Sequence, residues 1–114
     1  MTSIYHMADA QEWQAACRAG TYAGTVTDRK DGFIHFSSAD QVRESAAKHR
    51  KGIAGLLLLR VDATKLGSVL KWEPARGGQL FPHLYGPLDP ALVDSVVALP
   101  LGADGLHIFP SGIP

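Results

Sequence analysis

The chain has 114 residues, of which 46% are hydrophobic, and 11 lysines and arginines balance 11 aspartates and glutamates. A chain of this length buries about two thirds of its unfolded surface, enough for one hydrophobic core, so we expect residues 1–114 to form a single domain. Zero net charge argues against a nucleic-acid polymer as partner, the longest apolar run, Ile53–Leu59, is too short to span a membrane, and one cysteine excludes an internal disulfide.

The first predicted elements are a short strand over residues 3–7 and a helix that follows it. Asp9 and Glu12 have the spacing of a capping box, which predicts a helix that begins after Asp9 and ends at Gly20. Helical periodicity indicates that one face of this helix is buried. The residues on that face are Trp13, Ala16 and Cys17.

Residues 21–31 are polar and turn-rich, which is typical of a loop. Residues 33–37 then have the composition of a strand. In a strand with alternating side chains, His35 and Ser37 lie on the same side, with Phe36 on the other.

A second helix is predicted after this strand. Ser38 and Gln41 have the spacing of another capping box, and the pattern continues to about Arg50. The strand therefore delivers its polar side chains to a helix N-terminus. Residues 53–61 are almost uniformly apolar, which favours a central strand that is covered on both faces.

Strands dominate the rest of the chain. We expect strands over residues 68–73, 93–101 and 106–109, and an extended segment over 80–87 whose prolines confine it to an edge or a bend. The tail, residues 110–114, is expected to fray. Two helices in the first half, without regular β-α-β alternation, favour an α+β fold with mostly antiparallel pairing.

Histidines beside aromatic residues are the first candidates for a functional site. His6 follows Tyr5, His35 lies within residues 32–37, and His83 lies within residues 81–86. The structural alternative for each of these histidines, taken alone, is a half-buried ring that bonds a backbone carbonyl. Their recurrence in aromatic motifs favours a shared site.

Two charged residues lie at and just after the end of the strand over residues 68–73. Glu73 could accept a hydrogen bond from a hydroxyl or stabilise a cation, and Arg76 could bind a phosphate or carboxylate. Free backbone amides after Ser38 would offer a further anion site. The structural alternative is a solvated pair at the end of a strand.

Other chemistries have weaker support. His35, His83 and Glu73 could bind a metal, but their spacing matches no metal-binding motif, and we expect no metal. Ser37 is not in a Gly-x-Ser-x-Gly elbow, and a mid-helix Cys17 is expected to be inert, so a hydrolase triad is disfavoured.

These motifs together resemble a known family. The chain resembles the small bacterial proteins grouped as domain of unknown function family 952, over residues from about 4 to 97. That family looks like a compact relative of the ADP-ribosyltransferase fold. The matching segments are Ile4-Tyr5-His6, residues 31–38, Trp72-Glu73 and residues 81–88.

The resemblance implies two small, mainly antiparallel sheets around a cleft that holds NAD. Tyr5 and His6 match the position that bonds the NAD ribose and amide. The residues 36–38 match the position that packs on nicotinamide. Either Glu73 or His83 occupies the later acidic position, which supports the oxocarbenium-like transition state.

We therefore expect a cytoplasmic, monomeric protein that binds NAD or a related nucleotide as substrate in a histidine-lined cleft, and transfers or processes ADP-ribose. The alternatives are a noncatalytic ligand-binding or protein-interaction domain, and a metal-dependent hydrolase. The expected catalytic residues are His6, Glu73 and His83. The expected ligand-binding residues are Tyr5, His6, His35, Phe36, Ser37, Ser38, Arg76 and Tyr85.

Overall fold

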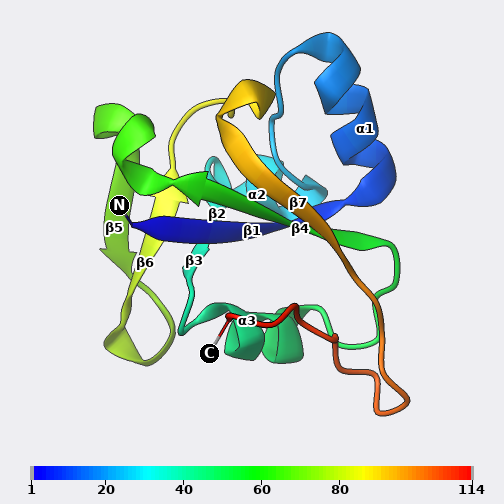
Figure 1. Cartoon of the computed structure of the whole chain (residues 1–114). Helices are drawn as coiled ribbons and strands as arrows, with labels where there is room; N and C mark the ends of the chain where they lie inside the picture. Colours follow the sequence, from blue (N-terminus) through cyan, green and yellow to red (C-terminus); the bar gives the residue numbers. More distant parts are fainter. Residues whose placement is uncertain (1, 114) are drawn as a thin grey trace.

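A four-stranded antiparallel sheet with the order β3-β1-β4-β7 runs through the middle of the molecule (Figure 1). The computed structural model describes residues 2–113. The predicted central strand is confirmed, since β4 pairs with β1 on one side and with β7 on the other. The strands are β1 (Ser3–Asp9), β3 (Ser37–Ser38), β4 (Leu56–Asp62) and β7 (Val93–Leu99).

A second antiparallel sheet has the order β2-β6-β5. Its strands are β2 (Ile34–His35), β5 (Leu70–Pro74) and β6 (Leu80–Leu84). The prediction that prolines confine residues 80–87 to an edge or a bend is wrong for residues 80–84, because β6 is the central strand of its sheet. β2 ends at His35, opposite His83, and beyond it Pro82 is bonded on this side only through its oxygen, which accepts from the Phe36 N–H.

Three α-helices lie within residues 2–113, all in the first half of the chain. In Figure 1, α1 and α3 lie at opposite ends of the molecule. None of these helices is long and apolar enough to cross a membrane. The helices are α1 (Ala10–Ala19), α2 (Val26–Asp31) and α3 (Val42–His49), with short 3-10 turns η1 (Ala63–Lys65), η2 (Gly67–Val69), η3 (Arg76–Gly78) and η4 (Pro90–Leu92).

Alternating residues of β1 supply two hydrophobic clusters. Ile4 and Ala8 belong to a cluster with Trp13 of α1, and Met7 belongs to another with Val42 of α3. Because successive side chains of a strand point to opposite faces, the larger sheet is covered on both faces. The α+β class with two antiparallel sheets is therefore confirmed.

Helix α1 begins and ends where its sequence predicts. Asp9 accepts a hydrogen bond from the Glu12 N–H at 3.0 Å, and Gly20 ends the helix with φ 82°. The burial predicted for Cys17 is wrong, since this residue is exposed. Trp13 is the large side chain that anchors the helix, and Cys17 lies beyond the narrow buried face.

Helix α2 corrects the prediction of a loop over residues 21–31. The Thr25 hydroxyl accepts from the Asp28 N–H at 3.2 Å, and the Asp28 carboxylate accepts from the Thr25 N–H at 2.8 Å. These reciprocal bonds form a capping box in which aspartate replaces the usual glutamate or glutamine. The box stabilises a helix of only six residues.

The strand predicted over residues 33–37 is wrong as a single element. β2 pairs with β6 in one sheet, and β3 pairs with β1 in the other, so the chain changes sheets at Phe36. The Phe36 N–H donates to the Pro82 oxygen at 3.0 Å. The break arises because the residues before and after Phe36 pair with different strands. Local sequence does not encode this pairing.

Two smaller predictions also differ. Helix α3 begins at Val42 rather than directly after Ser38, because the Gln41 side chain accepts from the Ser38 N–H without a reciprocal cap. Residues 106–109 form no strand and contribute one isolated bridge, Leu101 to His107. The tail was expected to fray, but Ile113 packs against the hydrophobic cluster that contains Met7 and Val42. Residue 114 lies outside the described residues.

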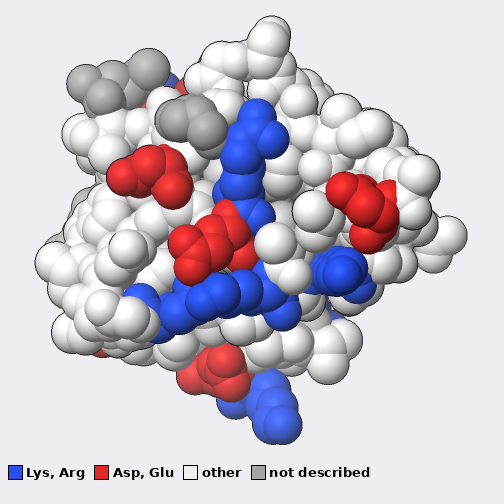
Figure 2. Space-filling view, turned by 90° about the horizontal axis from the view of Figure 1, so that it is seen from below, with Lys and Arg blue, Asp and Glu red and all other residues white. Residues whose placement is uncertain are grey.

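Charged side chains are unevenly distributed on the surface. Figure 2 views the molecule from below, the side on which α3 lies in Figure 1. On this face, Lys and Arg side chains form a band with Asp and Glu grouped beside it.

Candidate functional site

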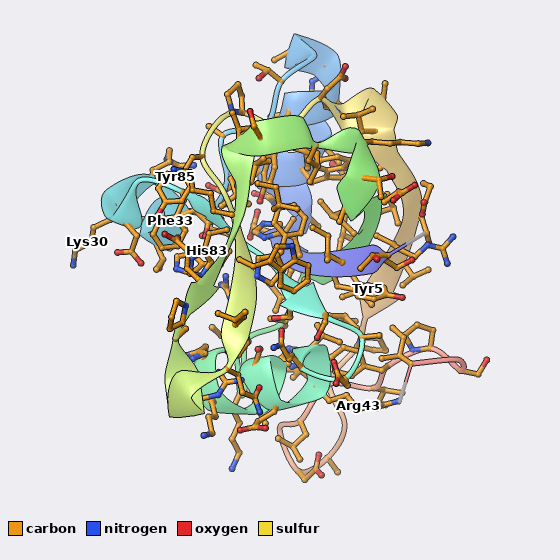
Figure 3. All side chains as sticks on the ribbon, turned by 90° about the vertical axis from the view of Figure 1, so that its left-hand side faces the viewer. Tyr5, Lys30, Phe33, Arg43, His83 and Tyr85 are labelled. Atoms are coloured by element: carbon orange, nitrogen blue, oxygen red, sulfur yellow. The ribbon has the colours of Figure 1, made fainter. Side chains whose placement is uncertain are left out.

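His83 of β6 is held by neighbouring side chains of the smaller sheet (Figure 3). Its Nδ1 lies 2.8 Å from Oε1 of Glu73, which also accepts a hydrogen bond from the Tyr85 hydroxyl at 2.7 Å. Phe33 stacks on the His83 ring, with centroids 4.2 Å apart and planes inclined at 27°. Because a carboxylate only accepts, Nδ1 of His83 carries the proton and donates it.

The shared carboxylate oxygen changes the acidity of its partners. The hydrogen bond from Tyr85, followed by that from His83, lowers the pKa of Glu73. The same bond to Glu73 raises the pKa of Tyr85, because the neutral phenol donates it. Glu73 is therefore an ionised group that orients His83.

Asp28 performs a comparable task for His35. It is 2% exposed and accepts from the His35 N–H at 3.1 Å and from the ring Nδ1 at 2.5 Å. Burial alone would raise the pKa of Asp28, but hydrogen bonds from His35 and the proximity of His6 lower it overall. Asp31 lies on the other side of the ring, 3.2 Å from Nε2 of His35.

His6 of β1 lies behind this pair and is 2% exposed. Its Nδ1 is 2.7 Å from the main-chain oxygen of His35, and its Nε2 is 2.7 Å from the Tyr22 hydroxyl. Since a carbonyl only accepts, Nδ1 carries the proton, and Tyr22 donates to Nε2. Burial lowers the pKa of His6, and the negative charge of Asp28 offsets this only in part. His6 is therefore a neutral ring in one defined tautomer.

Arg76 of the η3 turn lies against α3 and adds positive charge next to the histidines. Arg76 donates from Nη2 to the Ser45 hydroxyl and from Nη1 to Nε2 of His49, both at 3.3 Å. The hydroxyls of Ser45 and Ser37 are 3.0 Å apart. Burial, followed by the charges of Arg76 and Arg50, lowers the pKa of His49.

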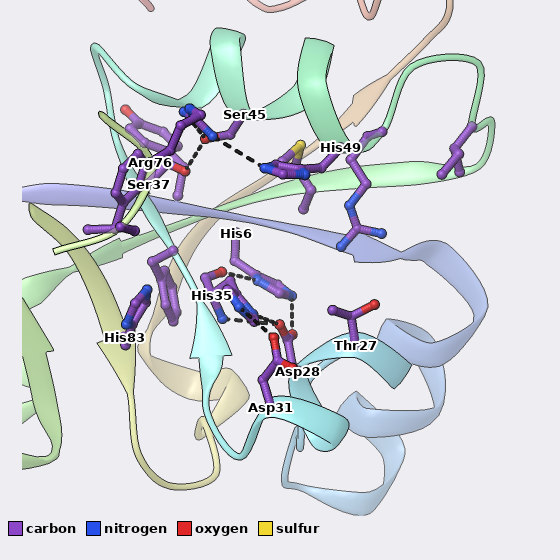
Figure 4. Close-up of a pocket in the computed structure, with 17 residues that line it drawn as sticks. His6, Thr27, Asp28, Asp31, His35, Ser37, Ser45, His49, Arg76 and His83 are labelled. Atoms are coloured by element: carbon purple, nitrogen blue, oxygen red, sulfur yellow. Dashed lines mark hydrogen bonds and ion pairs between the residues drawn. The ribbon is translucent and has the colours of Figure 1, made fainter. Parts of the chain in front are cut away.

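These groups surround one cleft of about 570 Å³ (Figure 4). In this view, Arg76, Ser45 and His49 lie at one end, Asp28 and Asp31 lie at the other, and His6 and His35 lie between. The cleft has the size of a small-molecule site. It is formed by segments from β1, α2, β2, β3, α3, the η3 loop and β6.

Most of the residues predicted from sequence line this cleft. Those that line it are Tyr5, His6, His35, Phe36, Ser37, Arg76 and His83. The residues Ser38, Glu73 and Tyr85 do not line it. Glu73 and Tyr85 lie behind His83, and the Ser38 hydroxyl donates to Asp40 at 2.5 Å. Glu73 and His83, considered as alternatives for one position, are therefore a bonded pair.

Sequence reasoning missed Asp28, Asp31, His49 and Arg50, which also line the cleft. The spacing of Thr25 and Asp28 is the only local signal for any of them. Within residues 2–113, no group of three or more His, Cys, Asp or Glu side chains is arranged to hold a metal ion. In the set suggested by sequence, Glu73 instead bonds Nδ1 of His83.

Solved structures of a bacterial protein are similar to the chain. The crystal structure of protein CC0527 from Caulobacter crescentus is 47% identical, with 94% of each chain covered and a TM-score of 0.91. A crystal structure of its double methionine mutant is 46% identical, with the same coverage and TM-score. Its solution NMR structure is 48% identical, covers 93% of this chain and 91% of that one, and has a TM-score of 0.82.

A comparison with curated proteins found no match. The model of the family described as protein of unknown function, DUF952, matches residues 7–96. This match spans most of the chain and includes His35, Glu73 and His83. The chain therefore belongs to the DUF952 family.

Proposed function

We propose that the cleft binds NAD or a related nucleotide, as the resemblance to ADP-ribosyltransferases implies. The observation that carries the proposal is the meeting of His6, His35 and His83 at one cleft, from three separate strands. A volume of about 570 Å³ suits a nucleotide-sized ligand. Because fold alone does not define function, the proposal depends on these side chains.

His83 and Glu73 have different roles in this proposal. Glu73 holds the Nδ1–H of His83 at 2.8 Å and is therefore a positioning residue. The Nε2 of His83 remains available to accept a hydrogen bond from a ligand hydroxyl such as that of ribose. His6, already bonded at both ring nitrogens, supports the position of His35 through the latter's main-chain oxygen.

The cleft also has features that suit transfer of ADP-ribose. Breaking the bond between ribose and nicotinamide leaves positive charge on the ribose while the bonding electrons leave with nicotinamide. Asp28 and Asp31 place carboxylates at one end of the cleft, where they would stabilise this charge. Phe36 also lines the cleft, but it is 2% exposed and belongs to the hydrophobic cluster that contains Ile4 and Trp13.

A noncatalytic ligand-binding domain is the second candidate. Glu73 does not line the cleft, and its Oε1 is already bonded to both His83 and Tyr85. This placement favours binding without turnover, because the carboxylate expected to support the transition state contacts a histidine instead.

Spectra of isotope-labelled protein titrated with NAD, ADP-ribose and AMP test the proposal. We expect shifts at His35, His83 and Ser37 and weaker binding by His83→Gln. Arg18→Gln is the control, because Arg18 is exposed on α1 and does not line the cleft. An absence of shifts at millimolar ligand would refute nucleotide binding. Measuring nicotinamide release then separates an enzyme from a noncatalytic binder.

A further inference from the structure

We infer that the end of the cleft beneath α3 is a phosphate subsite formed by Arg76, His49 and Arg50, so that the ligands are phosphorylated nucleosides rather than bare nucleosides. This inference rests on the proposed function and deepens it, since it assigns an orientation and a chemical class to the ligand. It depends on how Arg76 is held, on the charges around it, and on the opposite charge at the other end of the cleft.

The guanidinium of Arg76 is fixed in place and still has donors to offer. Its terminal nitrogens contact Ser45 and His49 at 3.3 Å, its Nε lies 3.4 Å from Oε1 of Glu44, and its carbon lies 4.9 Å from the centre of the Phe81 ring. A guanidinium has five N–H donors, so one N–H on each terminal nitrogen remains. Two such donors suit the oxygens of a phosphate.

Positive charge at this end is incompletely neutralised. Within residues 2–113, Arg50 lines the cleft and forms no ion pair. Glu44 is the carboxylate beside Arg76, but its side chain is 56% exposed and also bonds Lys48 at 3.2 Å. Arg76 therefore shares one solvated carboxylate with Lys48, and an anion bound at its guanidinium would gain attraction that this carboxylate does not cancel.

The far end of the cleft repels the same anion. Asp28 is buried and its pKa is lowered, and Asp31 lies beside it on α2. A ligand with phosphate at one end therefore has one favourable orientation, with its phosphate beneath α3 and its sugar toward His35 and His83.

The role of Arg76 can be tested by comparing ligands that differ only in phosphate. We expect AMP to bind the wild-type protein at least about tenfold more tightly than adenosine, because its phosphate gains charge-assisted hydrogen bonds that adenosine lacks. Arg76→Gln should weaken the binding of AMP by a similar factor and leave the binding of adenosine unchanged. Arg18→Gln, on the exposed side of α1, should alter neither.

Isothermal titration at fixed ionic strength gives these affinities, and circular dichroism confirms that each variant is folded. If Arg76→Gln does not fold, Arg50→Gln replaces it with the same expectation. Inorganic pyrophosphate and ribose 5-phosphate, tested separately, should shift the amide signals of Ser45 and His49, because they carry the phosphate chemistry without the base.

Equal binding of AMP and adenosine, with no effect of Arg76→Gln or Arg50→Gln, would overturn the subsite and leave nucleotide binding intact. Binding of pyrophosphate at Ser45 and His49 without binding of NAD, AMP or adenosine would support an anion site and overturn the proposed function. The two ideas therefore fail in distinguishable ways.

Discussion

His35 and His83 are directly opposite each other across the β2–β6 pair, and each has its Nδ1 bonded to a carboxylate, Asp28 at 2.5 Å and Glu73 at 2.8 Å. The two ring centroids are 5.6 Å apart. The carboxylates come from α2 and β5, which lie on separate parts of the chain. Two strands thus present a pair of histidines whose ring orientations are set independently.

Asp28→Asn should destabilise the protein by about 2–4 kcal/mol, because an amide cannot accept all the hydrogen bonds that the buried carboxylate accepts. Urea unfolding followed by tryptophan fluorescence measures this change. Asp31→Asn is the matched control, since its side chain is 41% exposed, and we expect less than about 1 kcal/mol. Equal losses in the two variants would show that burial of Asp28 has no special role.

Gly24→Ala should be more damaging than Gly32→Ala. Both glycines have positive φ, 92° and 88°, so each alanine incurs a backbone cost of about 1–2 kcal/mol. A Cβ at Gly24 would lie 2.6 Å from the Cβ of Asp28, whereas nothing lies within 4 Å at Gly32. Steric displacement of Asp28 should add about 1–3 kcal/mol in the urea titration. Similar free energies of unfolding for both variants would contradict this contact.

The neutral state of His6 predicts a dependence of stability on pH. Its folded pKa is lowered, so the unfolded chain binds more protons once the pH falls below about 6.5. The free energy of unfolding should therefore decrease as the pH falls from about 7 to 5, with a contribution from His6 of at most about 1.4 kcal/mol per pH unit. His6→Gln should reduce this slope.

His49 needs a separate control, because its pKa is also lowered. The His6→Gln variant should keep part of the dependence of the free energy of unfolding on pH. This remaining dependence should be weaker in the double variant that also carries His49→Gln. The ionised states of Asp28 and Glu73, whose pKa values are lowered, are lost only below about pH 4.5. An unchanged slope in His6→Gln would show that His6 is not held neutral.

Tyr85 should titrate above the ordinary pKa of tyrosine because its hydroxyl donates to Glu73. Glu73→Gln removes the carboxylate charge and should return the pKa of Tyr85 toward its usual value. Ultraviolet absorption of phenolate follows the titration, and Tyr85→Phe identifies which part of the signal belongs to this residue. An identical Tyr85 titration in Glu73→Gln would rule out the shared hydrogen bond.

Exposure of Cys17 predicts rapid reaction with a thiol reagent under native conditions. We expect about one thiol per chain to react at nearly the rate of the urea-unfolded protein, and the labelled protein to keep its stability within about 0.5 kcal/mol. Cys17→Ser provides the blank. Reaction only after unfolding would instead support the buried position that helical periodicity predicts.

Local signals predicted much of the fold. The cap at Asp9, the stop at Gly20 and the apolar run around β4 each depend on neighbours in sequence, so α1 and the central strand were identified. The change of sheet at Phe36 depends on which distant strands pair with its two sides. Helix α2 was missed because its short cap uses Asp28 in place of the expected glutamate or glutamine.

The candidate site was predicted in part for similar reasons. His6, His35 and His83 occur in aromatic motifs, and the structure brings all three to the cleft. Their carboxylate partners are set by tertiary contacts, so Asp28 carried no sequence signal of contact with His35. His49 lines the cleft through the tertiary packing of α3, which helical periodicity does not specify.

The cap of α2 also has a consequence for the lengths of chain that the fold can tolerate. One carboxylate completes the turn that begins at Thr25 and holds the ring of His35. A single inserted residue between Thr25 and Asp28 would rotate that carboxylate away from one partner or the other. The segment from Thr25 to Asp28 is therefore a spacer of fixed length, and homologues that preserve the site should vary in loop length elsewhere.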